Sequence, residues 1–404
     1  MEEIGIETGF EGLTATQMLS LCRNRPAYFY SRRRIGDRIA AFRKAMPRAT
    51  RLAYSVKANP FPPLIQHVAG LVDGVDVTSY NEMIASLNAG VPARSIMFAG
   101  PAKKAHELQA AVAMGVRVSA ESVTELRRIA EAATTAGTRA AVLLRVNPQL
   151  SLRGASMRMG GAPTQFGIDE DDLGTAWTLL DSPHLRFCGI HIYWGSQCLS
   201  AQAITEAQAA CVDLVERLSP FFPNPPEKIN LGGGFGVPHF SSDTALDIRQ
   251  VGKGFGPLLT RLAARFPSAE VFLELGRYLV CEAGIYVCQV VDIKRSHGKT
   301  FVVTDGGLHH FLAATGNFGQ KIRRNFRLGT IPARPRAFAT AMTGAPDLEV
   351  VGALCTPIDL LGHGLAGPEI EIGDLIVVNC AGAYGRSASP VDFLSHDHPG
   401  EYMI

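Results

Sequence analysis

Lys57 is the first residue whose type and place suggest chemistry, because it lies in the stretch SVKAN (residues 55–59) after an apolar run. A lysine at the end of a buried strand loses solvation, which lowers its pKa and makes the neutral amine more available. The neutral amine is the form that attacks a carbonyl group to give a Schiff base. A single lysine more often reaches solvent from a strand end, so the hypothesis depends on what the other strands carry.

Two other strand ends carry groups that suit a phosphate-bearing ligand. Gly232–Gly236 has the sequence GGGFG, and bare glycine amides can approach and bind a phosphate. The stretch ELGR places Glu274, Gly276 and Arg277 at the end of another apolar run. Taken separately, a glycine run is more often a tight turn and Glu274 could be an ordinary salt-bridge partner. Together with Lys57, they favour a reactive amine beside a phosphate site.

The elements that must position these groups are eight short apolar runs, which alternate with longer segments of helical period. The runs lie at residues 51–58, 74–79, 95–100, 116–122, 140–147, 187–194, 228–234 and 271–277. Eight β-then-α units of this length fit a closed (β/α)8 barrel better than an open doubly wound sheet. Active sites of such barrels lie at the carboxyl ends of the strands. We therefore expect an α/β barrel with its site at that end.

A second domain is predicted after Arg277, where strand-like segments with turn-rich links replace the helical period. At 404 residues, the chain also exceeds the size at which one hydrophobic core usually stops growing. We predict a barrel over 30–278 and a β domain from 1–29 plus 279–404. The Gly- and Ser-rich stretch at 150–167, just past the fifth strand, is a candidate lid or substrate loop.

The composition excludes several classes of partner. The chain has 39 Lys and Arg against 37 Asp and Glu and no long basic block, which argues against nucleic-acid and membrane-surface roles. No window approaches the roughly 18 apolar residues of a membrane span, and the acidic N-terminal residues lack an apolar signal-peptide core. Eight cysteines without CxxC spacing indicate neither a metal site nor a disulfide framework. We expect a cytoplasmic protein that acts on small molecules.

Seven motifs along the chain resemble those of the fold-type III pyridoxal-phosphate decarboxylases. These are the diaminopimelate, ornithine and arginine decarboxylases, with an alanine-racemase-like barrel. The motifs are YSVKAN (54–59), DVTSYNE (76–82), GSQ (195–197), GGGFG (232–236), ELGR (274–277), CTPID (355–359) and GAY (382–384). Among the subgroups, the sequence is most similar to the carrier-protein and exosortase-associated decarboxylases. The resemblance implies a carboxy-lyase that uses pyridoxal 5'-phosphate to release carbon dioxide from an amino acid or amino-acyl conjugate.

The resemblance also implies a role for each matching residue. Lys57 would hold the cofactor aldehyde as a Schiff base, Glu274 would pair with the pyridine nitrogen, and Cys355 would return a proton to the α-carbon. Asp76 and Arg145 match positions that line the ring and the lysine, although either could be a structural ion-pair partner. The implied phosphate ligands are Ser196, Gly234, Gly276, Arg277 through its backbone, and Tyr384.

The segment HIYWGS departs from the family pattern, which has a histidine two residues before the Gly-Ser pair. Tyr193 occupies that place here, and His191 lies two residues earlier on the same strand face. We assign stacking on the cofactor ring to Tyr193, because an aromatic face can replace an imidazole. His191 is more plausible as a hydrogen-bonded barrel residue than as a catalytic base.

The partners follow from the same resemblance. Cys355 and Tyr384 belong to the predicted β domain, which in this family completes the site of the neighbouring subunit, so a homodimer with two shared active sites is implied. Thr356 follows the cysteine where the diamino-acid enzymes carry an acidic residue that binds a distal ammonium. We therefore expect a substrate with a non-cationic distal end. Further candidate substrate residues are Asp359, which could instead be structural, and Arg153 and Arg158, which could instead be solvated loop residues.

Three alternatives remain open at this point. A diaminopimelate or other diamino-acid decarboxylase shares the scaffold, as does an amino-acid racemase, although Cys355 within CTPID favours decarboxylation. A regulatory or cofactor-binding homologue without activity is the non-enzymatic alternative. The presence of Lys57, Glu274 and Cys355 together argues against it.

Overall fold

The computed structural model describes residues 10–23, 25–148, 157–158, 163–240, 242–318, 320, 323–334, 347–365 and 370–404, with only the backbone at 157–158. The chain divides into two compact units. The barrel unit comprises Gly36–Val237 and Thr244–Leu279, and the β unit comprises Met1–Ile35, Pro238–Asp243 and Val280–Ile404. The boundaries predicted at 30 and 278 lie near these limits, whereas the short excursion at Pro238–Asp243 was not anticipated.

The barrel unit is built on eight parallel strands, each paired with the next along the chain. They are β2 (Thr50–Ser55), β3 (Gly74–Val77), β4 (Ile96–Phe98), β5 (Arg117–Ala120), β6 (Ala140–Asn147), β9 (Leu185–Ile192), β11 (Lys228–Gly233) and β12 (Glu270–Leu275). The β12–β2 and β5–β6 pairings close the ring. The short strand β8 (Ile168–Asp169) adds to β6, and β10 (Gly195–Ser196) pairs with β7 (Met157–Arg158). The predicted (β/α)8 barrel is confirmed, with all eight of its strands.

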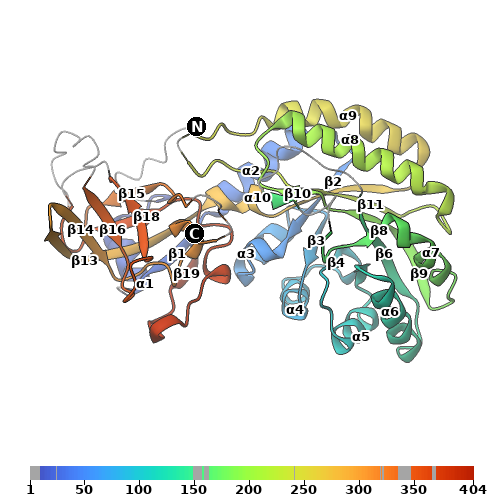
Figure 1. Cartoon of the computed structure of the whole chain (residues 1–404), viewed down its shortest axis with the longest axis horizontal. Helices are drawn as coiled ribbons and strands as arrows, with labels where there is room; N and C mark the ends of the chain where they lie inside the picture. The colour runs from blue at the N-terminus through green and yellow to red at the C-terminus, as the bar shows by residue number, and fades with distance from the viewer. Residues whose placement is uncertain are drawn as a thin grey trace. The chain divides into compact units, whose positions relative to one another are not determined.

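Helices surround these strands (Figure 1). They are α2 (Arg32–Ala45), α3 (Pro62–Ala69), α4 (Tyr80–Asn88), α5 (Ala105–Ala113), α6 (Val123–Thr135), α7 (Leu173–Leu179), α8 (Ala201–Leu218), α9 (Ile248–Arg265) and the short α10 (Arg277–Val280). Several begin directly after a strand at a capping side chain. Ser79, Ser122 and Ser200 each accept a backbone N–H of the first turn of α4, α6 and α8. Short βα loops with defined ends therefore rim the carboxyl end of the barrel.

The β unit contains a mixed sheet centred on the long strand β13 (Gly284–Ser296). Its strand order is β15 (Leu328–Ile331), β18 (Leu375–Val378), β13, β14 (Lys299–Thr304), β16 (Leu348–Val351) and β17 (Leu360–His363). Strand β1 (Ala27–Tyr30) pairs with β13 and with β19 (Gly400–Met403). Helix α1 (Ala15–Cys22) packs Met18 against Phe29, Ile285 and Val377. The predicted C-terminal β domain is confirmed.

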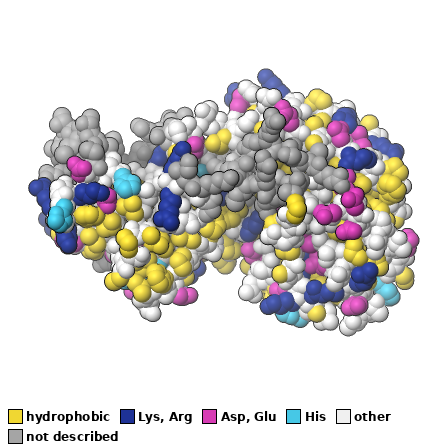
Figure 2. Space-filling model, viewed as in Figure 1, with side chains coloured by type: hydrophobic (Ala, Val, Ile, Leu, Met, Phe, Trp, Pro, Cys, Tyr) yellow, Lys and Arg dark blue, Asp and Glu magenta, His cyan; other side chains and the backbone are white. Residues whose placement is uncertain are grey.

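Charged side chains of both signs are interspersed over the face of the barrel unit seen in Figure 2. This distribution agrees with the near balance of 39 basic and 37 acidic residues. Within the described ranges, none of the helices has the length and apolar character needed to span a bilayer.

Candidate active site

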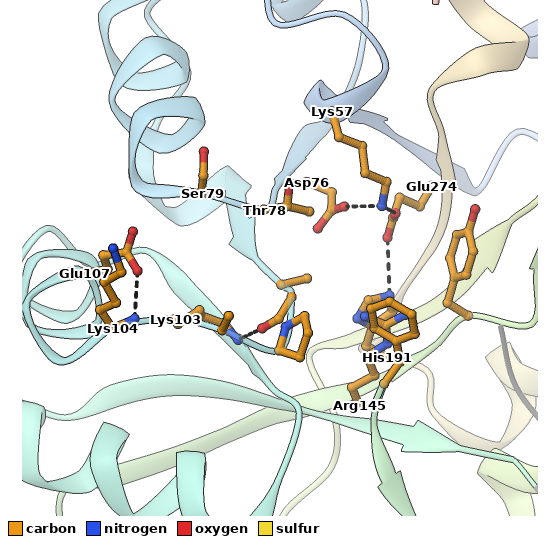
Figure 3. Close-up of a pocket in the computed structure, with 16 residues that line it drawn as sticks. Lys57, Asp76, Thr78, Ser79, Lys103, Lys104, Glu107, Arg145, His191 and Glu274 are labelled. Carbon is orange, nitrogen blue, oxygen red and sulfur yellow. Dashed lines mark hydrogen bonds and ion pairs between the residues drawn. The ribbon is translucent and has the colours of Figure 1, made fainter. Parts of the chain in front are cut away.

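A cavity of about 370 Å³ lies at the carboxyl ends of the barrel strands, inside the barrel unit (Figure 3). Its walls come from the ends of β2, β3, β6, β9 and β12 and from the loops that follow β3 and β4. The lining residues are Lys57, Asp76, Thr78, Ser79, Ala99, Gly100, Pro101, Ala102, Lys103, Lys104, Glu107, Arg145, Phe166, His191, Tyr193 and Glu274. Six of the residues predicted from the sequence, Lys57, Asp76, Arg145, His191, Tyr193 and Glu274, therefore meet at one cavity.

Lys57 lies in a single 3-10 turn (Val56–Ala58) that follows β2, because the strand itself ends at Ser55. Its Nζ atom is 3.6 Å from Asp76 Oδ2 and 3.6 Å from Glu274 Oε1. The same atom lies 5.4 Å from the centroid of the Tyr193 ring. The lysine side chain is 32% exposed, whereas both carboxylates are 1% exposed. Its amine is thus held against two buried carboxyl groups while remaining open to the cavity.

The two carboxyl groups beside Lys57 ionise differently. Burial raises the pKa of Asp76 well above its usual value, and the negative charge of Glu274 raises it further. Burial alone would also raise the pKa of Glu274, but the Lys57 ammonium and the His191 imidazole outweigh it and hold that pKa well below its usual value. Of the two groups, Glu274 therefore ionises first, and Asp76 holds its proton more strongly.

Three polar side chains fix the Glu274 carboxylate. Ser55 Oγ donates to Oε1 at 2.9 Å, and Asn230 Nδ2 donates to Oε2 at 3.2 Å. His191 Nε2 lies 3.3 Å from Oε2, and its Nδ1 is 2.9 Å from Ser119 Oγ. Burial lowers the pKa of His191, so its ring is neutral at pH 7. These contacts support His191 as a hydrogen-bonded barrel residue. The positions of Ser55, Ser119 and Asn230 were not singled out from the sequence, because they lie inside apolar runs.

Arg145 is held by a carboxylate that the sequence interpretation missed. Its Nη1 donates to Glu121 Oε1 at 2.6 Å, and its guanidinium lies 5.9 Å from the Tyr193 ring and 5.0 Å from the Phe166 ring. Glu121 also accepts the backbone N–H groups of Gly100 and Gly167. Arg145 is therefore both a structural ion-pair partner and part of the cavity wall. A polar residue directly after β5 was the only sequence signal for Glu121.

The glycine-rich strand ends come close to one another around the same end of the barrel. Gly234 has φ of +73°, and its carbonyl accepts the N–H of Cys198, two residues after Ser196. A Cβ atom on Gly234 would lie 2.5 Å from Gly195 O, and one on Gly276 would lie 2.8 Å from Ala58 Cβ. Only glycine leaves room for this packing. Gly276 thus lies against the turn that carries Lys57, and Arg277 begins α10 directly after it.

The cavity residues fit pyridoxal phosphate on physical grounds. An anionic Glu274 suits a protonated ring nitrogen, and the amine of Lys57 lies 3.6 Å from that carboxylate. Both oxygen atoms of Asp76 are buried and have no hydrogen-bond partner among the described residues, which leaves a buried polar group for a ligand to satisfy. The volume falls within the range of small-molecule sites.

The remaining predicted residues lie in the β unit or outside the described ranges. Cys355 is exposed and Thr356 is partly exposed. Asp359 is 2% exposed, and its two oxygens accept the N–H groups of Leu308 at 2.6 Å and Leu354 at 2.9 Å. Tyr384 has φ of +52°. Most of the candidate loop at 150–167, with Arg153 and the side chain of Arg158, lies outside the described residues, although Phe166 from its end lines the cavity.

Comparison with known proteins agrees with this geometry. Residues 32–281 match the model of the pyridoxal binding domain of pyridoxal-dependent decarboxylases. The chain is 38% identical to the L-glutamyl-[BtrI acyl-carrier protein] decarboxylase of Niallia circulans, over 94% of this chain and 88% of that one. It is 31% identical to the 2-[(L-alanin-3-ylcarbamoyl)methyl]-2-hydroxybutanedioate decarboxylase of Staphylococcus aureus, over 88% of each chain.

A solved structure shares the fold of the whole chain. The diaminopimelate decarboxylase of M. jannaschii, crystallised with L-lysine, superposes with a TM-score of 0.88 at 22% identity, covering 100% of this chain and 92% of that one. The matched pyridoxal-binding model, the two relatives and the cavity with its lysine agree with one another. The chain therefore belongs to the pyridoxal-dependent decarboxylases, and it is a carboxy-lyase with pyridoxal phosphate as its cofactor.

Proposed function

We propose that this decarboxylase removes the α-carboxyl group of an amino acid or amino-acyl conjugate whose distal end carries no positive charge. The observation that carries the proposal is the state of the two polar residues after Cys355. Thr356 has no charge to offer, and Asp359 is buried with both oxygens committed to backbone N–H groups. Neither residue can therefore neutralise a distal ammonium without breaking other bonds.

Each of the barrel residues would have a separate role toward the bound cofactor. Pyridoxal phosphate supplies an aldehyde that captures the substrate amine and a ring that takes up the electron pair left when carbon dioxide departs. Lys57 would hold that aldehyde and exchange it for the substrate. Glu274, held anionic by Lys57 and His191, would keep the ring nitrogen protonated. Tyr193 would pack on the ring, and Asp76 and Arg145 would line it.

The phosphate would bind at the glycine-rich strand ends. Ser196 and Gly234 lie on adjoining segments linked by the Cys198 N–H to Gly234 O bond of 2.9 Å. Gly276 and the backbone of Arg277 come from the end of β12, and the Arg277 amide opens α10. Backbone amides at such turns suit a phosphate. Tyr384, from the β unit, would complete this set.

We further propose that the enzyme acts as a homodimer, in which the β unit of one subunit completes the site of the other. Cys355 would then return a proton to the α-carbon across the interface. Its exposure within a single chain supports a role that needs a neighbour. Of the ten large hydrophobic residues described as exposed, seven belong to the β unit: Leu21, Val291, Phe318, Ile358, Ile372, Phe393 and Leu394. This larger share of exposed apolar residues in one unit supports the proposed contact there.

The relatives support the choice of substrate class. The Niallia circulans enzyme is named for a glutamyl group on an acyl-carrier protein, and the Staphylococcus aureus enzyme for an alanyl conjugate of a hydroxybutanedioate. Neither name describes a free diamino acid. In the candidate loop, Arg153 and Arg158 would be suited to a carboxylate or phosphopantetheine on such a substrate. A cytoplasmic location is consistent with eight free cysteines.

Carbon dioxide release tests the proposal directly. The purified holoenzyme is given L-glutamate, a glutamyl thioester on a carrier protein, and free lysine, ornithine and meso-diaminopimelate in separate reactions. We expect release from a substrate with a neutral, acidic or carrier-linked end and little from the three diamino acids. Efficient turnover of any of the diamino acids would overturn the proposed substrate class.

A further inference from the structure

Two thiols and an imidazole meet in the β unit, in a cluster that the decarboxylation chemistry does not use. Cys281 Sγ donates to the carbonyl oxygen of Cys380 at 3.3 Å, and Cys380 Sγ donates to the carbonyl oxygen of Pro238 at 3.7 Å. His239 Nε2 lies 3.7 Å from Cys281 Sγ. Cys281 is fully buried, whereas Cys380 is partly exposed. Cys380 is thus the more exposed residue of the pair.

The backbone already holds the two thiol-bearing segments together. Gly382 N donates to Cys281 O at 3.0 Å, and Ala381 N donates to Gly284 O at 2.9 Å. The contact is so close that a Cβ atom on Gly382 would collide with Val280 O. Joining the two sulfurs therefore requires rotation of side chains within a fixed frame, rather than the approach of two separate segments.

We propose that Cys281 and Cys380 form a redox-active pair, which an oxidised low-molecular-weight disulfide converts to an intramolecular disulfide. The partly exposed Cys380 loses its proton to solvent and attacks one sulfur of the small disulfide. This forms a mixed disulfide and releases one small thiolate, which takes up a proton. Cys281 then transfers its proton to His239 and attacks the Cys380 sulfur, and the second small thiolate leaves and is protonated. Two protein thiols are oxidised and one small disulfide is reduced to two thiols.

The charges around Cys380 set the order and the rate of these steps. The hydrogen bond with Cys281 raises the pKa of the Cys380 thiol well above its usual value, burial and the neighbouring Glu282 raise it further, and Arg327 lowers it. The first attack needs the Cys380 thiolate, so it is slow at neutral pH and accelerates as pH rises. The second step does not wait for solvent, because His239 lies beside Cys281. The mixed disulfide should therefore not accumulate.

The disulfide would close a loop between positions 99 residues apart. A cross-link over a loop of this length restricts the unfolded chain and stabilises the folded one. The oxidised protein should therefore unfold at a higher temperature than the reduced protein. This chemistry is independent of the substrate, so its failure would leave the proposed function untouched.

The reduced holoenzyme is treated with oxidised glutathione at about pH 7 and about pH 9. The remaining thiols are then blocked with iodoacetamide, and the peptides are mapped by mass spectrometry. We expect a linked Cys281–Cys380 peptide that forms faster at the higher pH and is lost after dithiothreitol. The link should persist in the control variant Cys22→Ser, because Cys22 is a buried thiol of the same unit bonded to Met18 O. Cys380→Ser should abolish both the link and the gain in thermal midpoint.

Two results would overturn the proposal that Cys281 and Cys380 form a disulfide. In the first, oxidation stops at a glutathione adduct on Cys380. In the second, iodoacetamide still labels Cys281 when the oxidised wild type is denatured. Both are read on the wild-type protein, so the proposal stays open to refutation even if Cys380→Ser fails to fold.

Discussion

Asp76 and Glu274 lie at the same distance, 3.6 Å, from the Lys57 ammonium, yet their pKa values are displaced in opposite directions. The difference arises from their other neighbours. Ser55, Asn230 and His191 surround the Glu274 carboxylate with polar contacts, whereas the oxygens of Asp76 have no hydrogen-bond partner in the described part of the chain. One negative charge is therefore fixed at Glu274, where the proposal needs it.

Substitution of the two carboxyl groups should accordingly have unequal effects. Glu274→Gln removes the fixed anion, so we expect turnover with saturating cofactor to fall by about 100-fold or more. Asp76→Asn resembles the protonated acid and should cost less than about tenfold. The rim residue Glu107, which lines the cavity and caps α5, supplies the control Glu107→Gln. Equal losses in the two variants would show that the charge is not confined to Glu274.

A pair of buried histidines in the β unit predicts acid lability. Burial, with the charge of His396, lowers the pKa of His309 to about 4, and burial, with His309, lowers that of His310 to about 3. In the folded protein, the pKa values of both histidines lie below the ordinary value of 6.5. In acid, the unfolded chain therefore binds protons at these residues that the folded chain does not bind. The free energy of unfolding is therefore highest above pH 6.5, and it decreases as the pH falls toward the pKa values of the two histidines in the folded protein.

Urea unfolding followed by circular dichroism at several pH values measures this effect. Between about pH 7 and about pH 4.5, the two histidines should together remove on the order of 5 kcal/mol from the free energy of unfolding. His309→Leu should remove about half of that dependence, because His310 then remains as a buried imidazole that resists protonation. His363→Gln, at an exposed histidine of the same unit, is the matched control. An unchanged slope in His309→Leu would contradict the assignment.

Mixing two inactive variants tests the shared active site. Lys57→Ala and Cys355→Ala subunits that exchange freely give hybrids in which one site carries neither lesion. Random pairing makes half of the dimers hybrids, and one of the two sites in each hybrid is intact. About a quarter of wild-type activity should therefore return. Lys57→Ala mixed with Glu274→Gln is the control, because both lesions lie in the barrel and every site keeps one. Exchange without recovery in the first mixture would count against a shared site.

The barrel was predictable because its strands are buried on both faces and its helices follow at a regular interval. All eight apolar runs became strands, and a serine caps the helices that begin at Tyr80, Val123 and Ala201. Pro238–Asp243 could not be assigned to the β unit in advance, because its place depends on long-range contacts. The bond from Arg327 to Phe240 O, across 87 residues, is one of them.

Residues of the candidate site could be identified from the sequence where their type is unusual for their position in a strand. Residues whose type is common at such positions could not be identified. A lysine, a glutamate and a histidine are conspicuous at the ends of apolar strands. Ser55 and Asn230 are small polar residues inside such strands, and only their bonds to Glu274 reveal them. Glu121 was missed because its partner, Arg145, lies 24 residues away along the chain.

The most direct test of the account is the ratio of kcat/KM for a glutamyl conjugate to kcat/KM for meso-diaminopimelate. It is measured by carbon dioxide release in the wild type and in Thr356→Glu, and Thr356→Gln is the uncharged control. A buried ammonium without its partner costs about 3–5 kcal/mol, so the wild-type ratio should be at least about 100. Thr356→Glu should lower the ratio by at least about tenfold, whereas Thr356→Gln should leave it near the wild-type value. A wild-type ratio near one, or a glutamate no more effective than glutamine, would contradict the proposal that position 356 excludes a cationic distal end.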